Sequence, residues 1–421
     1  MKRRSLLGLG AAGLLAGWAL RPEDRGHAHT PYFNALNQLL RREGNGIPLL
    51  VVDMDALDHN IELLARRLAG KLPVRLVAKS LAANGLLGYL SEKLGTQRFM
   101  VFHQPQLNEL AQAFPRADLL LGKPLPARAA LSFYQQLGTR SAFDPARQLT
   151  WLIDTPQRLA EYAELANALG QPLQIALEID VGLARGGFTQ PAQLAEALTW
   201  LRQHKPSLTV RGLMGYEVQI AHTPPWVSQA SAFTDSMTRY RAFIDAAHAF
   251  ADLWPKDPIL NGAGSLTYPL HTLEDTPLNE VAVGSVLLKP ADFDSRLLSA
   301  HRPALYIASP VLKTQGGELP FLDGLQPLLQ RWDRNRQRAL YIYGGQWPAE
   351  PVSPEGLRYD TLYGRSANQE RLIGSERTAV GVDDWVFLRP QRSEGVLTAF
   401  NELRLLRHGR FVGSWAPHKH P

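Results

Sequence analysis

The chemistry that this sequence could perform centres on a lysine at the end of a short apolar run. Val74–Lys79 has the residue types and the length of a strand that is buried on both faces. A lysine in such a run is costly to bury unless its amine has a partner or a task. At the carboxyl end of a barrel strand, the amine of Lys79 would lie where barrel folds place their active sites, and it could form a Schiff base with a carbonyl. The alternative is a lysine that only extends its amine into solvent.

Three further groups follow later apolar runs in the same way. Arg185 lies in the turn Asp180–Gly187, Tyr216 ends the run Val210–Tyr216, and Gly262–Ser265 is a glycine-rich turn. Glycines after a late strand let backbone N–H groups approach a phosphate, which is a recurring feature of barrels. Each group also has an ordinary alternative, since Arg185 could form a surface ion pair and the glycines could form only a turn. A lysine, an aromatic ring and a phosphate site on one rim together indicate pyridoxal 5'-phosphate (PLP).

The elements that would position these residues alternate between strands and helices. Nine strand-like runs lie at Leu49–Asp53, Val74–Lys79, Arg98–Phe102, Asp118–Gly122, Trp151–Asp154, Ile175–Asp180, Val210–Tyr216, Ile259–Leu260 and Glu280–Leu288. Such alternation predicts parallel strands joined by crossover helices. The number of strands and the length favour an α/β fold with a closed, TIM-like (β/α)8 barrel over an open doubly wound sheet, and leave one of the nine strands outside the barrel.

The pattern changes near residue 300. Five strand-like runs follow, with no long helix between them and with Gly, Pro and Asn at the breaks, at 304–310, 339–343, 385–388, 402–406 and 411–414. We therefore assign residues 31–299 to the barrel and residues 300–421 to a C-terminal, mainly antiparallel β domain.

Length and composition agree with two domains. The 421 residues are too many for one ordinary core. The net charge of +6 is spread along the chain without a long basic run, so we expect no nucleic-acid partner. The absence of cysteine excludes disulfides, thiolate nucleophiles and thiolate metal ligands.

The first 30 residues predict a targeting segment. Lys2-Arg3-Arg4 precedes Ser5-Leu6-Leu7 and an apolar, glycine-rich run to Leu20, which is short for a bilayer span. The paired arginines resemble a twin-arginine export signal, which is read by a machinery that carries folded proteins. We expect a protein that is exported to the periplasm by this route and is either released or tethered to the inner membrane.

Several motifs in this order resemble the PLP enzymes of fold type III, which have the alanine-racemase-type barrel. Within them the chain is most similar to the D-threonine aldolase and D-serine dehydratase branch and to bacterial amino acid deaminase/aldolase proteins. The motifs are Leu50–Leu57 with Asn60, Val77–Ser80, Glu178–Gly182 with Arg185, Gly212–Tyr216 and Gly284-Ser285, and in the β domain Gly364–Glu370 and Ser393–Gly395.

The resemblance implies a role for each matching residue. Lys79 would be the Schiff-base lysine and general base, and Tyr216 would stack on the pyridine ring. Arg185 would support the phenolic oxygen of the cofactor or the carboxylate of the substrate. The phosphate would be held by Gly264, Ser265, Gly284 and Ser285, with Tyr268 reaching it as well. The resemblance also implies a homodimer, in which the second domain of one subunit closes the site of the other.

The chain departs from alanine racemases beside the pyridine nitrogen. Those enzymes have an arginine two residues before the position of Gly284, where this chain has Ala282. An arginine there damps charge delocalisation into the ring, so its replacement argues against a dedicated alanine racemase. Glu280 lies two residues further back on the same strand face and could approach the nitrogen, or could form an ion pair at the rim.

A second departure concerns metal. The aldolase and dehydratase branch carries a His-x-Cys zinc motif in the β domain, and the region we match to it, Pro390–Glu394, has neither residue. We expect no zinc by that route, and we expect His418 and His420 to belong to a mobile tail.

The leading hypothesis is a lyase, an aldolase or deaminase/dehydratase, that acts at Cα of a D-amino acid through Lys79. A racemase of broad scope is the alternative, and it would need a second acid/base, for which Tyr341, Tyr343, Tyr359 and Tyr363 are available. A non-catalytic PLP carrier and a cofactor-free Schiff-base aldolase are further alternatives. The β domain argues against the carrier, while Tyr216 and the phosphate turn argue against the aldolase.

Overall fold

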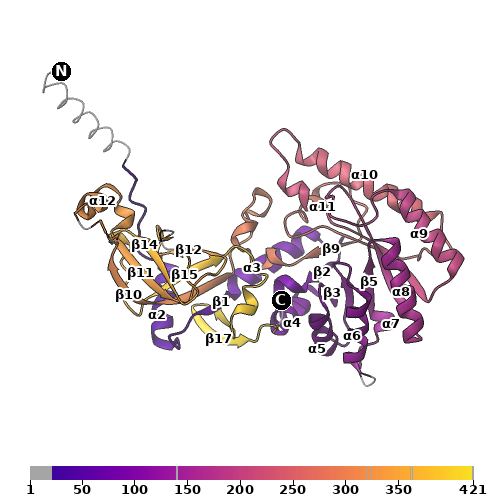
Figure 1. The fold of residues 1–421 in the computed structure, drawn as a ribbon, viewed down its shortest axis with the longest axis horizontal. Helices are drawn as coiled ribbons and strands as arrows, with labels where there is room; N and C mark the ends of the chain where they lie inside the picture. Colours follow the sequence, from indigo (N-terminus) through magenta and orange to yellow (C-terminus); the bar gives the residue numbers. More distant parts are fainter. Residues whose placement is uncertain are drawn as a thin grey trace, which may run out of the picture. The chain divides into compact units, whose positions relative to one another are not determined.

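The computed structural model describes residues 21–138, 141–319, 321–322, 324–360, 362 and 364–419. The targeting segment predicted for residues 1–30 therefore lies mostly outside the described residues. Among the described residues, no helix is both long and apolar enough to span a bilayer. The chain folds into two compact units, which we call the barrel unit and the sheet unit (Figure 1).

The barrel unit comprises Met54–Ala304, Ser393–Asn401 and the chain from Trp415 onward. Its strands are β2 (Val74–Val77), β3 (Arg98–Val101), β4 (Asp118–Leu121), β5 (Leu149–Ile153), β6 (Leu173–Ile179), β7 (Leu208–Gly215), β8 (Ile259–Gly262) and β9 (Glu280–Val283). All neighbours pair in parallel, and β9 pairs with β2, which closes an eight-stranded barrel and confirms the predicted fold class.

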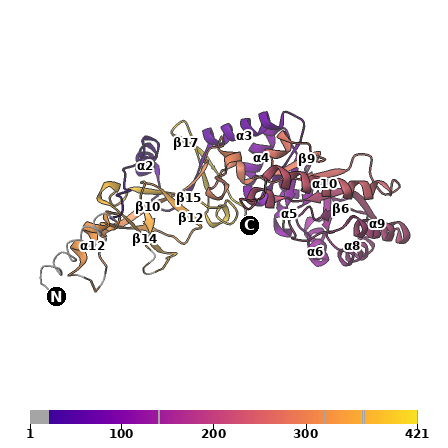
Figure 2. The ribbon, with the colours of Figure 1, turned by 90° about the horizontal axis from the view of Figure 1, so that it is seen from above.

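Helices surround the strands on the outside of the barrel (Figures 1 and 2). They are α3 (Met54–Leu68), α4 (Asn84–Leu94), α5 (Gln104–Ala113), α6 (Ala127–Leu137), α7 (Pro145–Gln148), α8 (Pro156–Leu169), α9 (Pro191–His204), α10 (Gln229–His248) and α11 (Leu270–Leu273). The start of α8 shows why a helix begins where it does. Thr155 caps it by accepting a hydrogen bond from the N–H of Arg158, and Pro156 occupies the first turn.

Two strands end earlier than the sequence predicted, because the chain turns at the rim of the barrel. The short 3₁₀ helix η1 (Ala78–Leu81) follows β2, so Lys79 lies two residues beyond the strand end and not in it. Likewise η3 (Ser285–Leu287) follows β9 directly after Gly284.

The sheet unit comprises the chain up to Asp53, Leu305–Arg392 and Glu402–Ser414. Its strands are β1 (Leu49–Asp53), β10 (Leu305–Gly316), β11 (Arg338–Tyr343), β12 (Ala349–Ser353), β13 (Arg358–Tyr359), β14 (Gln369–Gly374), β15 (Trp385–Pro390), β16 (Leu403–Arg407) and β17 (Arg410–Trp415), with the helices α2 (Pro31–Glu43) and α12 (Gln326–Trp332). All but one of the named pairings between different strands of this sheet are antiparallel, which confirms the predicted character of the domain.

The strand that lies outside the barrel is β1. It pairs antiparallel with β10 and parallel with β16, so it lies in the middle of the sheet unit. Its apolar residues are buried on both faces, as they would be in a barrel, and for this reason the sequence could not assign it. The structure therefore places residues 31–53 in the sheet unit rather than in the predicted range 31–299, and moves residues 393–401 from the predicted β domain to the barrel unit.

The C-terminal segment is packed against the barrel, which corrects the prediction of a mobile tail for His418. The side chain of His418 is buried, and its ring nitrogens bond to Gln106 (3.2 Å) and Asn84 (2.9 Å). Its backbone N–H donates to the carbonyl of Ala82 (2.8 Å). Burial lowers the pKa of His418 to about 4, so the ring is neutral at physiological pH. His420 lies outside the described residues.

We expect His418→Ala to destabilise the protein by about 2–3 kcal/mol, because it leaves the buried amide of Gln106 and the half-buried amide of Asn84 without their partner. The free energy of unfolding in urea measures this. Lys419→Ala, at the exposed neighbouring position, is the matched control and should change stability by less than about 0.5 kcal/mol. Equal effects of the two substitutions would show that the tail does not contribute to stability through His418.

Candidate active site

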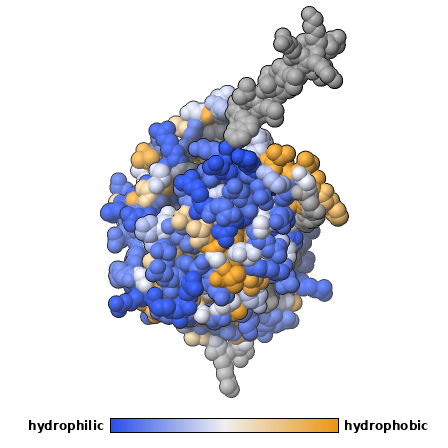
Figure 3. Space-filling view, turned by 90° about the vertical axis from the view of Figure 1, so that its left-hand side faces the viewer, coloured by the Kyte–Doolittle hydropathy of each residue, from blue (hydrophilic) through white to orange (hydrophobic). Residues whose placement is uncertain are grey.

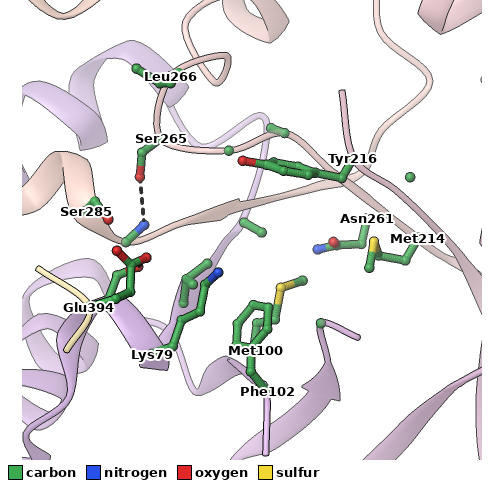
Figure 4. Close-up of a pocket in the computed structure, with 18 of the residues that line it drawn as sticks. Lys79, Met100, Phe102, Met214, Tyr216, Asn261, Ser265, Leu266, Ser285 and Glu394 are labelled. Atoms are coloured by element: carbon green, nitrogen blue, oxygen red, sulfur yellow. Dashed lines mark hydrogen bonds between the residues drawn. The ribbon is translucent and has the colours of Figure 1, made fainter. Parts of the chain in front are cut away.

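One pocket at the carboxyl ends of the barrel strands brings together most of the predicted residues (Figure 4). It is lined, among others, by Lys79 after β2, Arg185 after β6, Tyr216 after β7, Gly264 and Ser265 after β8, and Gly284 and Ser285 after β9. Every lining residue belongs to the barrel unit. Parallel strands present their carboxyl ends on one rim, which is why positions far apart in sequence meet here.

Lys79 lies beside an aromatic ring on the pocket wall. Its Nζ is 4.4 Å from the centre of the Phe102 ring, which follows β3. A lysine ammonium over such a ring is stabilised by the negative face of the ring. Phe102 also excludes water from one side of the amine, as does the neighbouring Met100. Neither residue stands out in the sequence, because aromatic and aliphatic side chains near strand ends are ordinary core residues.

On the opposite wall Arg185 lies over the ring of Tyr216. The guanidinium carbon is 4.9 Å from the ring centre, and Nη2 is 3.9 Å from Oε1 of Glu178. Glu178 is buried at the end of β6, and burial raises its pKa to about 7, although Arg185 lowers it and Asp154 and Asp180 raise it further. The charge on Glu178 therefore changes near neutral pH, and the electrostatic attraction between Glu178 and Arg185 changes with it.

The glycine-rich turn after β8 is held from below by a buried carboxylate. Glu217, the residue after Tyr216, accepts hydrogen bonds from the N–H of Ala263 (3.1 Å) and from the hydroxyl of Thr267 (2.6 Å). It also lies 3.3 Å from Nε2 of His271. Ala263 has a left-handed backbone conformation (φ 65°), which costs a non-glycine residue about 1–2 kcal/mol. The hydrogen bond from its N–H to Glu217 helps to stabilise this conformation. Glu217 was not among the predicted site residues, although it directly follows one of them, Tyr216.

Ser265 links this turn to the turn after β9. Its Oγ accepts hydrogen bonds from the N–H groups of Gly284 and Val286, each at 3.1 Å (Figure 4). The hydroxyl hydrogen of Ser265 remains able to donate to an anion. Both glycines are required by close neighbours: a Cβ at Gly264 would lie 2.7 Å from the Tyr216 ring, and one at Gly284 would lie 2.9 Å from Ser80 and Val77.

Tyr268 does not line the pocket, which corrects the expectation that it reaches the phosphate. Its side chain is fully buried, and its hydroxyl bonds to Nε2 of His301 (2.7 Å) and to Nη1 of Arg67 (3.2 Å). Arg67 lies on α3 and His301 follows the 3₁₀ helix η5 (Arg296–Leu298), so the tyrosine fastens the turn after β8 to these two outer segments of the barrel unit. Burial raises the pKa of Tyr268 and lowers that of His301 to about 3.

Glu280 also lies away from the pocket, at the amino-terminal end of β9. It is buried and forms an ion pair with Arg75, at 2.6 Å from Nε, and with Arg98, at 3.2 Å. Of the two possibilities left open by the sequence, the structure thus shows the ion pair rather than a group beside the pyridine nitrogen. Burial alone would lower the pKa of Arg75, but Glu280 and Asp118 raise it above its ordinary value.

Asn261 connects this ion pair to the pocket. It lines the pocket from β8, and its Nδ2 donates to Oε1 of Glu280 (2.8 Å). A carboxylate paired with Arg75 can only accept, so the amide must turn its NH₂ group toward Glu280. Among the described residues, none donates a hydrogen bond to Oδ1 of Asn261. The sequence pattern did not single out this residue, which lies between the apolar run Ile259–Leu260 and the turn Gly262–Ser265.

A carboxylate from residues 393–401 completes the wall near Lys79. Glu394 lines the pocket and accepts a hydrogen bond from the hydroxyl of Ser80 (2.5 Å), while Ser393 lies 3.4 Å from the hydroxyl of Ser285. The sequence drew attention to Ser393–Gly395 only as part of a resemblance, because nothing in the spacing places this segment on the barrel. Within the ranges that the structure describes, no three His, Asp or Glu side chains are grouped to hold a metal.

Comparison with known proteins identifies the family. The model of the alanine racemase N-terminal domain matches residues 52–291, so the chain belongs to this family, as the sequence motifs predicted. An alignment with 3-hydroxy-D-aspartate aldolase of Paracoccus denitrificans has 23% identity and covers 58% of this chain and 61% of that protein. An alignment with alanine racemase of Levilactobacillus brevis has 31% identity but covers 37% of this chain and 40% of that protein. Both alignments span less than two thirds of the relative.

Solved structures share the fold of both units. D-threonine aldolase from Filomicrobium marinum has a TM-score of 0.69 at 16% identity, covering 88% of this chain and 96% of that one. D-threo-3-hydroxyaspartate dehydratase from Delftia sp. HT23 has a TM-score of 0.67 at 14% identity, with 89% and 97% covered. Alanine racemase from Bacillus anthracis has a TM-score of 0.65 at 14% identity, with 88% and 97% covered. At these identities the likeness establishes the fold.

The close contact between Gly264 and Tyr216 gives a first prediction. We expect Gly264→Ala to destabilise the protein by about 1–3 kcal/mol, because the new methyl group must displace the ring. In the background of Tyr216→Ala the same substitution should cost much less, since the ring is gone. A double-mutant cycle of unfolding free energies measures the coupling. Additive effects would contradict the observed contact.

The raised pKa of Glu178 gives a second prediction. The folded state holds a proton up to about pH 7, whereas the unfolded state releases it near 4.5, so the wild type loses stability relative to Glu178→Gln as the pH rises between these values. The difference should grow by up to about 3 kcal/mol and then level off. Urea unfolding from pH 4.5 to 8 tests this, with Glu164→Gln on the exposed face of α8 as the matched control. A constant difference would show that Glu178 titrates normally.

Proposed function

We propose that this protein is a PLP-dependent lyase that acts at Cα of a D-amino acid. The observation that carries the proposal is that Lys79, Tyr216 and Ser265 line one pocket together with Ala282, in a chain of the alanine racemase N-terminal domain family. PLP, when bound, supplies an electron sink that stabilises negative charge at Cα.

The residues of the pocket fit this cofactor. The amine of Lys79 would bind its aldehyde covalently, and the ring of Tyr216 offers a flat surface for its pyridine ring. Two turns that cannot accept a Cβ, at Gly264 and Gly284, would receive its phosphate beside the hydroxyls of Ser265 and Ser285. The glycines themselves are required by Tyr216, Ser80 and Val77, so the hydroxyls of Ser265 and Ser285 are the groups that would meet the phosphate.

The chain's own groups would then direct the chemistry. The amine of Lys79 would move the proton at Cα or on the leaving fragment of the substrate. Arg185 lies on the same pocket wall as Tyr216, where it would bind the substrate carboxylate or the phenolic oxygen. Asn261, oriented by Glu280, would accept a hydrogen bond from the ring nitrogen, which favours its protonated form and a strong electron sink.

Lyase chemistry is preferred to racemisation for two reasons. Ala282 stands where alanine racemases have the arginine that weakens the electron sink. The similar proteins also include a 3-hydroxy-D-aspartate aldolase, a D-threonine aldolase and a hydroxyaspartate dehydratase, whose named reactions break a bond at Cα or Cβ. A homodimer in which the sheet unit of one subunit closes the site of the other belongs to the same proposal. Tyr341, Tyr343 and Tyr359 lie in the sheet unit, whereas Tyr363 is outside the described residues.

Product analysis tests the proposal. Purified protein with PLP is incubated in deuterated water with D-threonine, D-serine, 3-hydroxy-D-aspartate and each enantiomer of alanine. We expect an amine or amino acid with an aldehyde, or a keto acid with ammonia, from at least one hydroxy amino acid. Lys79→Ala should lower turnover by about 10²–10⁴-fold, whereas the exposed Lys123→Ala should not.

Other products would replace the proposed reaction. Deuterated mirror-image alanine without cleavage products would identify a racemase. Binding of PLP without turnover of any substrate would identify a carrier. Turnover without bound PLP would identify a cofactor-free aldolase.

A further inference from the structure

Helix α12 of the sheet unit buries a polar side chain and exposes its apolar side chains to solvent. In α12 the only buried side chain is the polar Gln326, which donates to the carbonyl of Gly317 (3.2 Å). The exposed side chains at Leu325, Leu328, Leu329 and Trp332 follow the i, i+3, i+4, i+7 spacing of one helix face. Phe321, in the preceding turn, is 98% exposed and Leu328 is 67% exposed. We call Phe321, Leu325, Leu328, Leu329 and Trp332 the α12 patch.

A contiguous exposed apolar surface of this kind is unusual in a soluble domain and marks an interaction site. Figure 3 views the sheet unit from the end that carries α12 and shows apolar residues gathered at the surface. Arg331 and Arg334 are exposed at the end of α12. Arg25 is also exposed, and its backbone N–H donates to Asn335, three residues after α12. Glu23 is exposed there too, and Asp24 is partly buried beside Ser375. Within residues 325–335 the exposed charged side chains are those of Arg331 and Arg334, while the exposed carboxylates Glu318 and Glu376 lie outside this range.

The start of the described chain is fastened to the same place. Nδ2 of Asn335, three residues after α12, donates to the carbonyl of Glu23 (2.8 Å), and its Oδ1 accepts from the N–H of Arg25 (2.9 Å). Residues 5–20, the apolar run of the predicted export signal or anchor, therefore join the fold beside the α12 patch. From Leu20 to Glu23 the chain can span at most about 10 Å.

We propose that the α12 patch is a membrane-binding surface that rests on anionic lipid. A bilayer that holds residues 5–20 must lie within about 10 Å of Glu23, and so within reach of α12. Leucines and a phenylalanine would enter the interface, Trp332 suits the headgroup boundary, and the arginines would meet lipid phosphates. This inference concerns attachment and is independent of the reaction proposed above.

The absence of cysteine makes a site-specific test possible, since one introduced cysteine accepts one environment-sensitive fluorophore. The full chain carries the label at Leu328→Cys or, as the matched control, at Leu273→Cys, which replaces a 72% exposed leucine of the barrel unit. Each protein is mixed with vesicles of phosphatidylglycerol and phosphatidylcholine in equal parts, and binding is followed by flotation. We expect a blue shift and a several-fold rise in emission at position 328 and no change at position 273.

The charge contribution has its own comparison. Vesicles of phosphatidylcholine alone should give a smaller response at position 328, and the double variant Arg331→Glu, Arg334→Glu should reduce the response to the anionic vesicles to that level. Equal responses to both vesicle types would overturn the assignment of anionic lipid.

Four results would overturn the membrane proposal itself. The protein could fail to float with the vesicles. It could float without any change at position 328, which would show attachment by residues 5–20 alone. The emission at position 328 could also be blue-shifted before vesicles are added. A shift that does not depend on protein concentration would show that residues 5–20 cover the patch. A shift that grows with protein concentration would show that a second copy of the chain covers it.

Discussion

The pairing of β2 with β9 is the constraint on which the site depends. The register sets Leu76 opposite Val283, so the residues after each strand meet at one point of the rim. Lys79 follows β2 and Gly284 follows β9, and a Cβ on that glycine would touch both Val77 and Ser80. The amine and the predicted phosphate site thus lie in one pocket because the barrel closes there. An open sheet with the same strands would separate them by its full width.

Buried charges shape the barrel above and below the pocket. Glu217 holds the turn after β8 through Ala263 and Thr267, and Glu280 holds Asn261 while it is paired with Arg75. Burying such carboxylates is costly unless each is hydrogen-bonded, and here each accepts at least two bonds. These hydrogen bonds orient the turn that would receive a phosphate and the amide that would face the ring nitrogen, so both are fixed before any ligand binds.

Strand-end positions in the sequence predicted much of the fold and the site. The alternation of strands and helices predicted the barrel. Lys79 and Tyr216 were found because each ends an apolar run, and Arg185 and Ser265 because each lies in the turn after one. Direction along a strand was harder to predict. Glu280 lies at the start of the four-residue strand β9, and those few residues cross from the floor of the barrel to the rim.

Contacts between distant segments could not be read from the sequence. Tyr268 turns to Arg67, which is 201 positions away, and His418 reaches Asn84 across 334 positions. Glu394 joins the pocket because residues 393–401 leave the β domain and pack on the barrel. A local sequence pattern contains no information on such distant partners. The strand β1 was therefore assigned to the barrel, the segment of Glu394 to the β domain, and His418 to a mobile tail.

The central claim is that the amine of Lys79 binds the aldehyde of PLP, and reduction followed by peptide mapping tests it most directly. The purified protein, saturated with PLP, is treated with borohydride, digested and analysed by mass spectrometry. The account predicts a phosphopyridoxyl group on the peptide that contains Lys79, together with an absorbance band at about 410–430 nm before reduction that is absent in Lys79→Ala. Labelling of a different lysine, or an unmodified Lys79 in protein that retains the band, would contradict it.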